Sequence, residues 1–301
     1  MIATPWPHDL QKYFDCIYWP RKIGRSQNTK RLYCVTIRVF GRFLGRPALV
    51  ADLDDDSVTA YIAYRAENVS LFAADKDRRN LSAIATFAAK KRHLAEFPDY
   101  PRVSLPKRNP RALTIAEIDR VLTACSRVPG MIGNARACDW WLAYYLLALV
   151  TGERTGAMLA LRWEWLRGEC LAVPGECRKD RKPCVYSLPP VVLSALQRLP
   201  RGDLLFAMPF SVCTFYLRNK RILRAAELPA TRQYQPQVCR RTFASWLESE
   251  GGNATEALGH TQRKTTKESY LDRTIAGEAP SAKVVARKIL LRKEWGSQHL
   301  S

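Results

Sequence analysis

The chain has 301 residues and a formal net charge of +20, and 47% of its residues are hydrophobic. This length suits two domains that each bury a core, and the charge favours a polyanionic partner without deciding between DNA, RNA and a membrane surface. The longest apolar run, residues 140–150, is too short to span a bilayer, and residues 1–19 lack the apolar core of a signal peptide. With nine cysteines and no CxxC pair, we expect a cytoplasmic protein with reduced thiols and no membrane partner.

The first hundred residues predict a small helical bundle. Apolar residues recur at helical spacing over residues 28–44, an acidic helix start at residues 52–56 opens a second helix, and residues 75–93 form a third. We expect about four helices in a domain that spans residues 1–100. The basic residues of the helix at 28–44 could contact phosphates or form a solvated face: Lys30, Arg31, Arg38 and Arg42.

Residues 101–112 predict a linker, because three prolines block both helix and sheet pairing there. Thr114 and Glu117 then have the spacing of a capping box, which opens the first helix of a second domain over residues 113–301. Near its end, residues 282–295 predict a tail helix with an apolar stripe and basic flanks.

A first motif follows a helix that is apolar nearly all round. This helix covers residues 140–151 and ends at Gly152. Residues 151–163 read TGERTGAMLALRW, which places Arg154 directly after the turn. Further along, residues 171–173 and 184–188 predict the two strands of a hairpin. The tip of the hairpin, residues 178–182, reads RKDRK.

A second motif occupies residues 236–270. Pro236 precedes a helix start, and a pair of arginines beginning at Arg240 opens an apolar-periodic run. The sequence Leu-Gly-His, ending at His260, then closes a short second helix, and Tyr270 follows ten residues later. Any one of these residues alone could be an ordinary surface side chain. Their order, with Phe243 and Ala244 also in place, points to a site.

These residue types suit the cleavage of a phosphodiester. A tyrosine hydroxyl can attack phosphorus and keep the bond energy in a covalent ester. Arginine holds non-bridging phosphate oxygens through two parallel hydrogen bonds and stays charged. Because phosphoryl transfer depends mainly on positioning and on charge neutralisation, two arginines and a tyrosine can supply most of the chemistry.

The two motifs resemble the signature boxes of the tyrosine recombinases, the phage-integrase family. In that pattern Arg154 falls on the first catalytic arginine and Arg240 on the second. His260 falls on the second histidine and Tyr270 on the nucleophile. Tyr186, in the second hairpin strand, is the main competing tyrosine.

The sequence departs from the family pattern at three points. Gln237 occupies the place of the usual first histidine, and Ala157 that of an acidic residue which buttresses the site. The gap from His260 to Tyr270 is one residue longer than the commonest spacing.

The family also has a lysine on the hairpin that acts as general acid on the leaving 5′ oxygen. Its usual spacing indicates Lys179, with Lys182 as the second choice. We expect Arg178, Arg181 and the other lysine to be solvated at the tip.

The resemblance implies a mainly α-helical, α+β protein, with an N-terminal core-binding domain and a C-terminal catalytic domain that ends in the tail helix. It implies a site-specific DNA recombinase or integrase, of the kind found on mobile elements, that works through a 3′-phosphotyrosine and a Holliday junction. It implies double-stranded DNA with specific sites as the partner, a homotetramer on that DNA, and no metal or other cofactor. Accessory DNA-bending factors are further candidate partners.

Two other functions stay open at this point. A type IB topoisomerase-like enzyme would use the same chemistry without bringing two sites together. A DNA-binding protein that has lost catalysis would explain Gln237, Ala157 and the longer gap before Tyr270.

Overall fold

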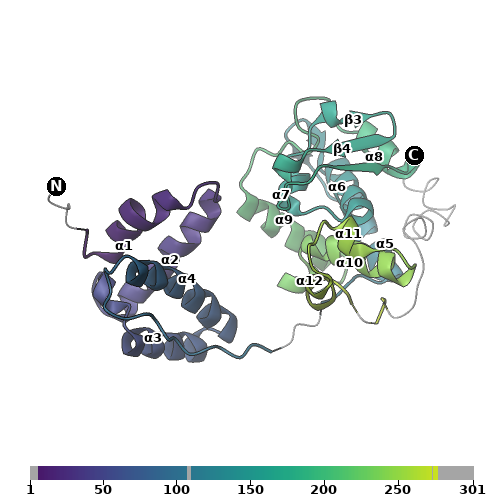
Figure 1. The fold of residues 1–301 in the computed structure, drawn as a ribbon. Coiled ribbons are helices and arrows are strands. Elements are labelled where there is room, and N and C mark those ends of the chain that lie inside the picture. The colour runs from purple at the N-terminus through teal and green to yellow at the C-terminus, as the bar shows by residue number, and fades with distance from the viewer. Residues whose placement is uncertain (1–5, 107–109, 273, 277–301) are drawn as a thin grey trace. The chain divides into compact units, whose positions relative to one another are not determined.

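The computed structural model describes residues 6–106, 110–272 and 274–276. The chain forms two compact units, Met1–Pro106 and Lys107–Ser301, drawn in purple to blue and in blue-green to yellow in Figure 1. Each unit has its own buried core. The tail helix expected over residues 282–295 lies outside the described residues.

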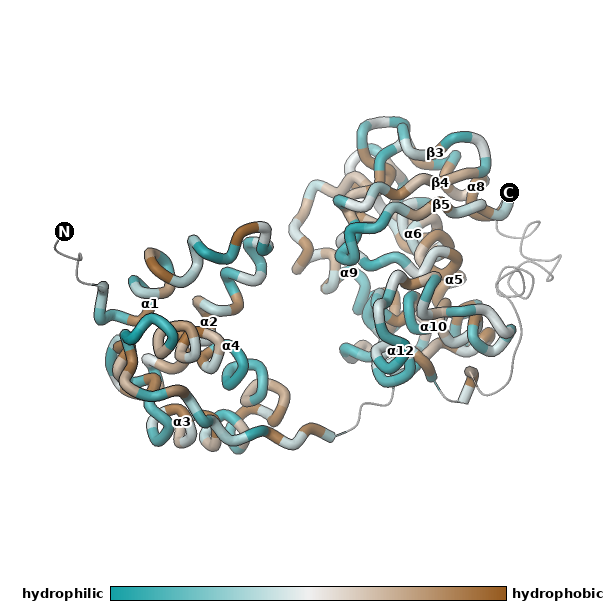
Figure 2. Tube along the Cα trace, viewed as in Figure 1, coloured by the Kyte–Doolittle hydropathy of each residue, from teal (hydrophilic) through white to brown (hydrophobic). Residues whose placement is uncertain are grey.

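In its described residues the first unit has four α-helices, the last three of which correspond to the three helices predicted from the sequence. They are α1 (Leu10–Tyr13), α2 (Gln27–Phe43), α3 (Asp55–Asn68) and α4 (Leu71–Lys90). Helix α4 begins four residues earlier than expected, because the side chain of Ser70 accepts a hydrogen bond from the Ala73 amide and caps the helix there. Figure 2 shows apolar and polar stretches alternating along these helices.

A buried carboxylate joins three helices of this unit. Asp77, which is fully buried on α4, accepts hydrogen bonds from Thr36 of α2 at 2.6 Å and from Tyr61 of α3 at 3.0 Å. Arg65 of α3 and Lys76 of α4 complete the group with ion pairs at 2.8 and 2.9 Å. Every partner is a donor, so the buried charge is compensated and fixes how the helices meet.

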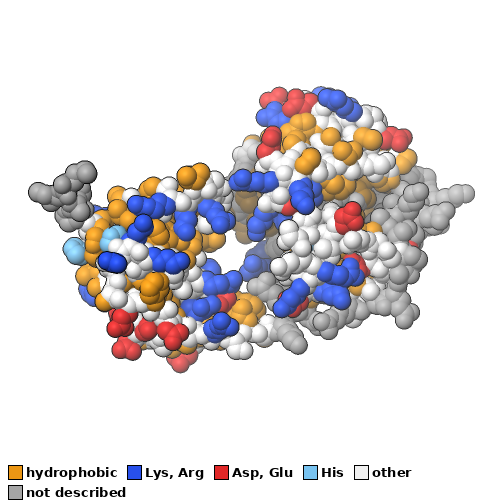
Figure 3. All heavy atoms as spheres, in the orientation of Figure 1, with side chains coloured by type: hydrophobic (Ala, Val, Ile, Leu, Met, Phe, Trp, Pro, Cys, Tyr) orange, Lys and Arg blue, Asp and Glu red, His pale blue; other side chains and the backbone are white. Residues whose placement is uncertain are grey.

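The basic side chains of α2 divide into two kinds. Lys30 is half-buried and forms an ion pair with Asp15 at 2.8 Å, whereas Arg31, Arg38 and Arg42 are exposed. Lys and Arg side chains dominate the charged part of the face of this unit that Figure 3 presents, with acidic side chains gathered at one edge.

The second unit is built around α6 (Ala137–Thr151), whose side chains are buried on all sides, as predicted. Helices α5 (Ile115–Ser126), α8 (Pro190–Gln197) and α10 (Gln237–Ser249) pack against it. Further helices of the unit follow in chain order: α7 (Thr155–Met158), α9 (Val212–Ala225), α11 (Ala254–Ala257) and α12 (Arg263–Ser269). The predicted capping box forms at the start of α5.

Two small antiparallel sheets complete this unit. Strands β1 (Met131–Ile132) and β2 (Ala135–Arg136) form a short hairpin before α6. The other sheet has the order β3–β4–β5. Its strands are β3 (Leu166–Arg167), β4 (Cys170–Val173) and β5 (Cys184–Ser187), with Leu171 opposite Tyr186. The predicted hairpin strands are therefore confirmed, and the α+β fold class with them.

The chain enters the second unit along buried backbone. Ala112 and Leu113 are fully buried, and their amides donate to the Asp272 carboxylate and to the Thr242 hydroxyl, each at 2.9 Å. These bonds attach residues 112–113 to α10 and to the segment just after Tyr270.

Among the described residues, no helix is long and apolar enough to cross a membrane.

Candidate active site

Arg154 is held at the turn between α6 and α7. Gly152 ends α6 with a left-handed backbone (φ 62°), and a Cβ atom at this position would lie 2.5 Å from Cδ1 of Phe243. Only glycine therefore fits where α10 packs against the turn. Arg154 follows as the N-cap of α7, with its side chain half-buried.

Arg240 lies at the centre of the arrangement and is fully buried. Its Nη1 donates to the Gly152 carbonyl and its Nη2 to the Leu258 carbonyl, both at 2.8 Å. One guanidinium on α10 thus connects the turn before Arg154 with the turn before His260. Burial, and then the charge of Arg154, lower the pKa of Arg240.

His260 is positioned by bonds to both ring nitrogens. Its Nε2 lies 3.4 Å from Nη2 of Arg240, and its Nδ1 lies 2.9 Å from the hydroxyl of Thr266 on α12. Because a guanidinium can only donate, Nε2 is the accepting nitrogen and Nδ1–H donates to Thr266. Burial, then the charges of Arg240 and Arg154, lower the pKa of His260 to about 4, which leaves the ring neutral near pH 7.

Tyr270 ends α12 beside these two residues. The centroid of the Tyr270 ring is 4.7 Å from that of His260 and 5.4 Å from Cζ of Arg240. The tyrosine packs against a small cluster of apolar side chains that is separate from the main core of the unit: Phe243, Ala244, Leu247, Ala254, Leu258 and Leu271.

Two guanidinium nitrogens of the site are buried without a hydrogen-bond acceptor among the residues described. Nη1 of Arg154 and Nε of Arg240 are both buried and, within the described part of the chain, have no hydrogen-bond partner. Leaving a charged donor unpaired is unfavourable, so these two atoms favour an anionic hydrogen-bond acceptor. The described residues contain no group of three or more His, Cys, Asp or Glu side chains that could hold a metal ion.

Comparison with solved structures identifies the fold. A lambda integrase dimer bound to a COC′ core site matches with a TM-score of 0.69 and 21% identity, covering 88% of this chain and 94% of the integrase chain. A lambda integrase tetramer bound to a Holliday junction matches with a TM-score of 0.67 and 19% identity, over 85% and 75% of the two chains. The Tn1549 transposon integrase in complex with circular intermediate DNA gives 0.61 and 17%, over 83% and 92%.

The chain has the tyrosine recombinase fold. No family model and no curated protein matches the sequence. In this fold the two motifs come together: Arg240 and His260 lie beside Tyr270, and the charge of Arg154 acts on both Arg240 and His260.

The hairpin tip also reaches the site. Lys179 and Lys182 are both exposed there, on either side of Asp180. A Cβ atom built on Gly259, which has φ +66°, would lie 1.9 Å from Oδ2 of Asp180, so the tip is packed directly against the residue before His260. The tip that carries both candidate lysines therefore lies against the turn that carries His260.

The two substitutions among the three departures from the family pattern occupy different places. Gln237 is the first residue of α10, half-buried, and lies one helical turn before Arg240 on the same face. Ala157 is buried at 3% exposure on α7 and carries no group that could hold a neighbour by charge or hydrogen bond.

One sequence-based expectation about the tip is wrong. Arg181 is exposed as expected, but Arg178 is 5% exposed and forms an ion pair with the buried Glu153, Nε to Oε1, at 2.7 Å. The basic run around it predicted solvation, because nothing local reveals a partner 25 residues earlier in the chain. Glu153 and Arg178 are thus residues near the site that the motif analysis missed.

The competing tyrosine is engaged elsewhere. The hydroxyl of Tyr186 donates to Oε1 of Glu153 at 2.7 Å. Burial, and then the negative charge of Glu153, raise the pKa of Tyr186, so its phenol is harder to ionise. Tyr270 instead lies beside Arg240 and His260.

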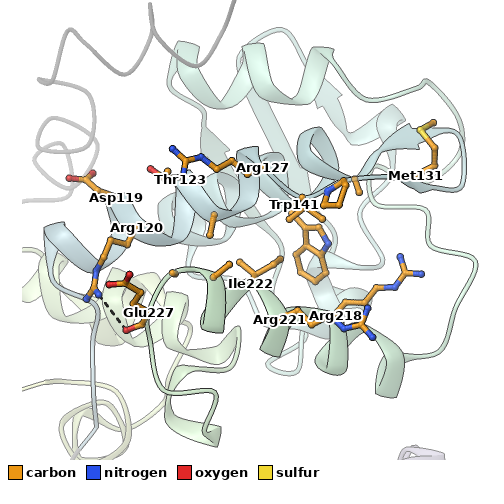
Figure 4. A pocket seen from close by; sticks show the side chains of 17 residues that line it. Asp119, Arg120, Thr123, Arg127, Met131, Trp141, Arg218, Arg221, Ile222 and Glu227 are labelled. Carbon is orange, nitrogen blue, oxygen red and sulfur yellow. Dashed lines mark hydrogen bonds between the residues drawn. The ribbon is translucent and has the colours of Figure 1, made fainter.

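A cavity of about 790 Å³ in the same unit is distinct from this site. It lies between α5, α6 and α9, with Trp141 and Ile222 on its apolar wall (Figure 4). Arg120, drawn at its edge, donates to the Glu227 carbonyl at 3.3 Å. None of the six sequence-predicted site residues is among those that line it.

Proposed function

We propose that the protein is a site-specific DNA recombinase that cuts and rejoins DNA through a covalent bond between Tyr270 and a 3′ phosphate. The observation that carries the proposal is a pair of buried guanidinium nitrogens without partners in the described part of the chain, Nη1 of Arg154 and Nε of Arg240, with Cζ of Arg240 at 5.4 Å from the centroid of the Tyr270 ring. Such a pair can neutralise two non-bridging oxygens of one phosphodiester.

In this mechanism the Tyr270 hydroxyl attacks phosphorus, and the bond from phosphorus to the 5′ oxygen breaks. Arg154 and Arg240 hold the negative charge that grows on the non-bridging oxygens. His260, neutral and accepting at Nε2, and the amide of Gln237 hydrogen-bond the phosphate or assist the tyrosine. The step conserves the phosphoester energy, so rejoining requires only that a 5′ hydroxyl attack the phosphotyrosine.

The leaving 5′ oxygen needs a proton. Lys179 at the hairpin tip is proposed as its donor, with Lys182 as the alternative. The tip packs on the residue before His260, which supports this role. The proposed cleavage step uses neither a metal ion nor another cofactor.

We further propose that two DNA sites are brought together by four copies of the protein, with the N-terminal unit contributing to DNA binding. Support comes from the lambda integrase structures, one a dimer on a core site and one a tetramer on a Holliday junction. The formal charge of +20 and the exposed arginines of α2 are consistent with a DNA partner in the cell.

The test is formation of a covalent adduct on a nicked suicide DNA substrate that carries the cognate site. On this substrate the short fragment with the released 5′ hydroxyl diffuses away, so the protein stays attached to the 3′ phosphate. The wild-type chain should give a covalent protein–DNA band. Tyr270→Phe should bind the DNA equally well and give none, because only the attacking oxygen is lost. Tyr186→Phe is the matched control and should still form the adduct.

Three outcomes separate the candidate functions. If Tyr186→Phe, and not Tyr270→Phe, abolishes the adduct, the nucleophile is wrongly assigned. Binding without any adduct would indicate a DNA-binding protein that has lost catalysis. Adducts and supercoil relaxation without recombinant products would indicate a topoisomerase-like enzyme.

A further inference from the structure

The inference concerns Glu153, the residue directly before Arg154, and rests on the proposed function. Glu153 is 4% exposed and has three partners. Its Oε1 lies 2.7 Å from both the Tyr186 hydroxyl and Nε of Arg178, and its Oε2 accepts from the Arg154 amide at 3.3 Å. A buried carboxylate is tolerated only when it is paired in this way, so its partners are held in turn.

Arg178 extends this contact into the hairpin tip. Its side chain is 3% exposed, although it lies within a run of charged residues. Nη1 donates to the Lys182 carbonyl at 3.0 Å, and Nη2 lies 3.7 Å from Oδ2 of Asp180. The guanidinium therefore spans the turn from inside and fixes the backbone on which both candidate lysines stand.

Asp180 completes the connection to the other side of the site. Its Oδ1 accepts from the Lys182 amide at 3.2 Å, and its Oδ2 lies against the Cα atom of Gly259. A continuous line of contacts thus runs from Glu153 through Arg178 and Asp180 to the turn that carries His260.

We propose that Glu153 is a positioning residue, which anchors Arg178 and thereby holds the lysine-bearing tip, residues 178–182, in the active site. It acts through Arg178 and touches neither the phosphate nor the leaving oxygen. Ala157, buried on α7, has no group that could do this. Glu153 gives this chain a buttress that comes from the residue before the first arginine.

The first test separates positioning of the general acid from all other roles. Glu153→Gln keeps the shape and the hydrogen bond from Tyr186 but loses the charge that holds Arg178. Adduct formation on the suicide substrate should slow by about 10- to 100-fold, because the tip that carries the general acid is no longer held by a charge-assisted contact. With sulfur in place of the 5′ leaving oxygen, the defect should shrink to within about threefold, because a thiolate is a far weaker base than an alkoxide and leaves without a proton.

The matched control is Glu164→Gln, since Glu164 is exposed and its ion pair with Arg162 is long, at 4.0 Å. It should cleave both substrates at the wild-type rate. Equal slowing of Glu153→Gln on both substrates would overturn the proposal, and so would wild-type rates on both. If the wild-type chain forms no adduct on either substrate, the proposed function itself fails, and the next test still reports on the anchor.

The second test does not depend on activity. Trypsin cleaves after exposed Lys and Arg, and the tip offers Lys179 and Arg181. Glu153→Gln should be cut there at least about fivefold faster than the wild-type chain under native conditions, and Glu164→Gln should not. Unchanged cutting would show that Glu153 does not hold the tip.

A double variant distinguishes positioning from stability alone. Glu153→Gln removes the nearer of the two carboxylates beside the buried Arg178 and leaves Asp180 at 3.7 Å, whereas Glu153→Gln with Arg178→Gln removes both charges of the closer ion pair. We expect the double variant to recover most of the lost melting temperature while cleavage of the oxygen substrate stays slow. If cleavage recovers together with stability, Glu153 only stabilises the fold and the proposal is wrong.

Discussion

Replacing Arg240 by lysine keeps the positive charge of the site but removes the fork that carries it. In the structure, Nη1 and Nη2 donate to two different buried carbonyls, those of Gly152 and Leu258, both at 2.8 Å. An ammonium group has a single nitrogen and cannot occupy both positions, so at least one carbonyl loses its donor.

The magnitude follows from that count. A hydrogen bond from a charged donor contributes about 1.5–3 kcal/mol, so Arg240→Lys should destabilise the second unit by about that amount. For a unit of this size, about 2–4 °C of melting temperature corresponds to 1 kcal/mol, so the melting temperature should fall by about 3–12 °C. Cleavage should slow by about 100- to 1000-fold, the usual effect of removing one donor from a site that stabilises developing charge.

Thermal unfolding followed by circular dichroism and adduct formation on the suicide substrate are the two assays. Arg232→Lys is the control, because Arg232 is exposed just before α10, and its melting temperature should not change. Wild-type stability of Arg240→Lys would refute the view that Arg240 braces the two turns. A loss of stability with full cleavage would show that Arg240 does not contact the phosphate.

Three further predictions follow from the site. Cleavage should persist in EDTA, because two arginines neutralise the phosphate, and strict dependence on added magnesium would contradict the mechanism. DNA binding should weaken with salt, with a slope of about −0.9 per phosphate contact in a plot of the logarithm of the binding constant against the logarithm of the salt concentration. Gln237→Ala should slow cleavage by about 10- to 100-fold through loss of one hydrogen bond to a charged group, and Gln237→His should be tolerated; an undiminished rate in the alanine variant would place Gln237 outside the site. Because the pKa of His260 is lowered to about 4 from its ordinary value of 6.5, the unfolded chain takes up a proton that the folded chain refuses, so stability should fall as the pH drops from 6.5 to 4. In urea titrations His260→Gln should reduce this fall, and an unchanged pH dependence would show that His260 is not responsible.

The parts of the fold that the sequence predicts well are those governed by local signals. Gly152 ends α6, Pro236 precedes α10, and Thr114 caps α5, each through backbone chemistry that acts within a few residues. The start of α4 was missed because Leu71 and Phe72 are partly exposed and lie off the apolar stripe, so only the cap at Ser70 marks it.

The candidate site was predictable in its residues but not in its support. The order of Arg154, Arg240, His260 and Tyr270 along the chain carries the resemblance, and the structure brings these four together. The burial of Arg178 was not predictable, because a charged turn is solvated unless a distant partner covers it. That partner, Glu153, is identified only when the hairpin has folded against the turn after α6.

The apolar cluster beneath Tyr270 is separate from the main core, and this has a consequence for regulation. Arg240 lies on a helix whose Val238 and Cys239 are buried in the main core, whereas the apolar packing of Tyr270 is on the small cluster, to which Phe243 and Leu247 of the same helix also belong. Because the apolar side chains beneath Tyr270 form the smaller cluster, we expect this part of the second unit to open locally at a lower free-energy cost than the part around the main core. Under the proposed function, Tyr270 then exchanges between a position in the site and an opened position. A neighbouring molecule that binds one of these two states shifts the equilibrium between them, while Arg240 stays in place.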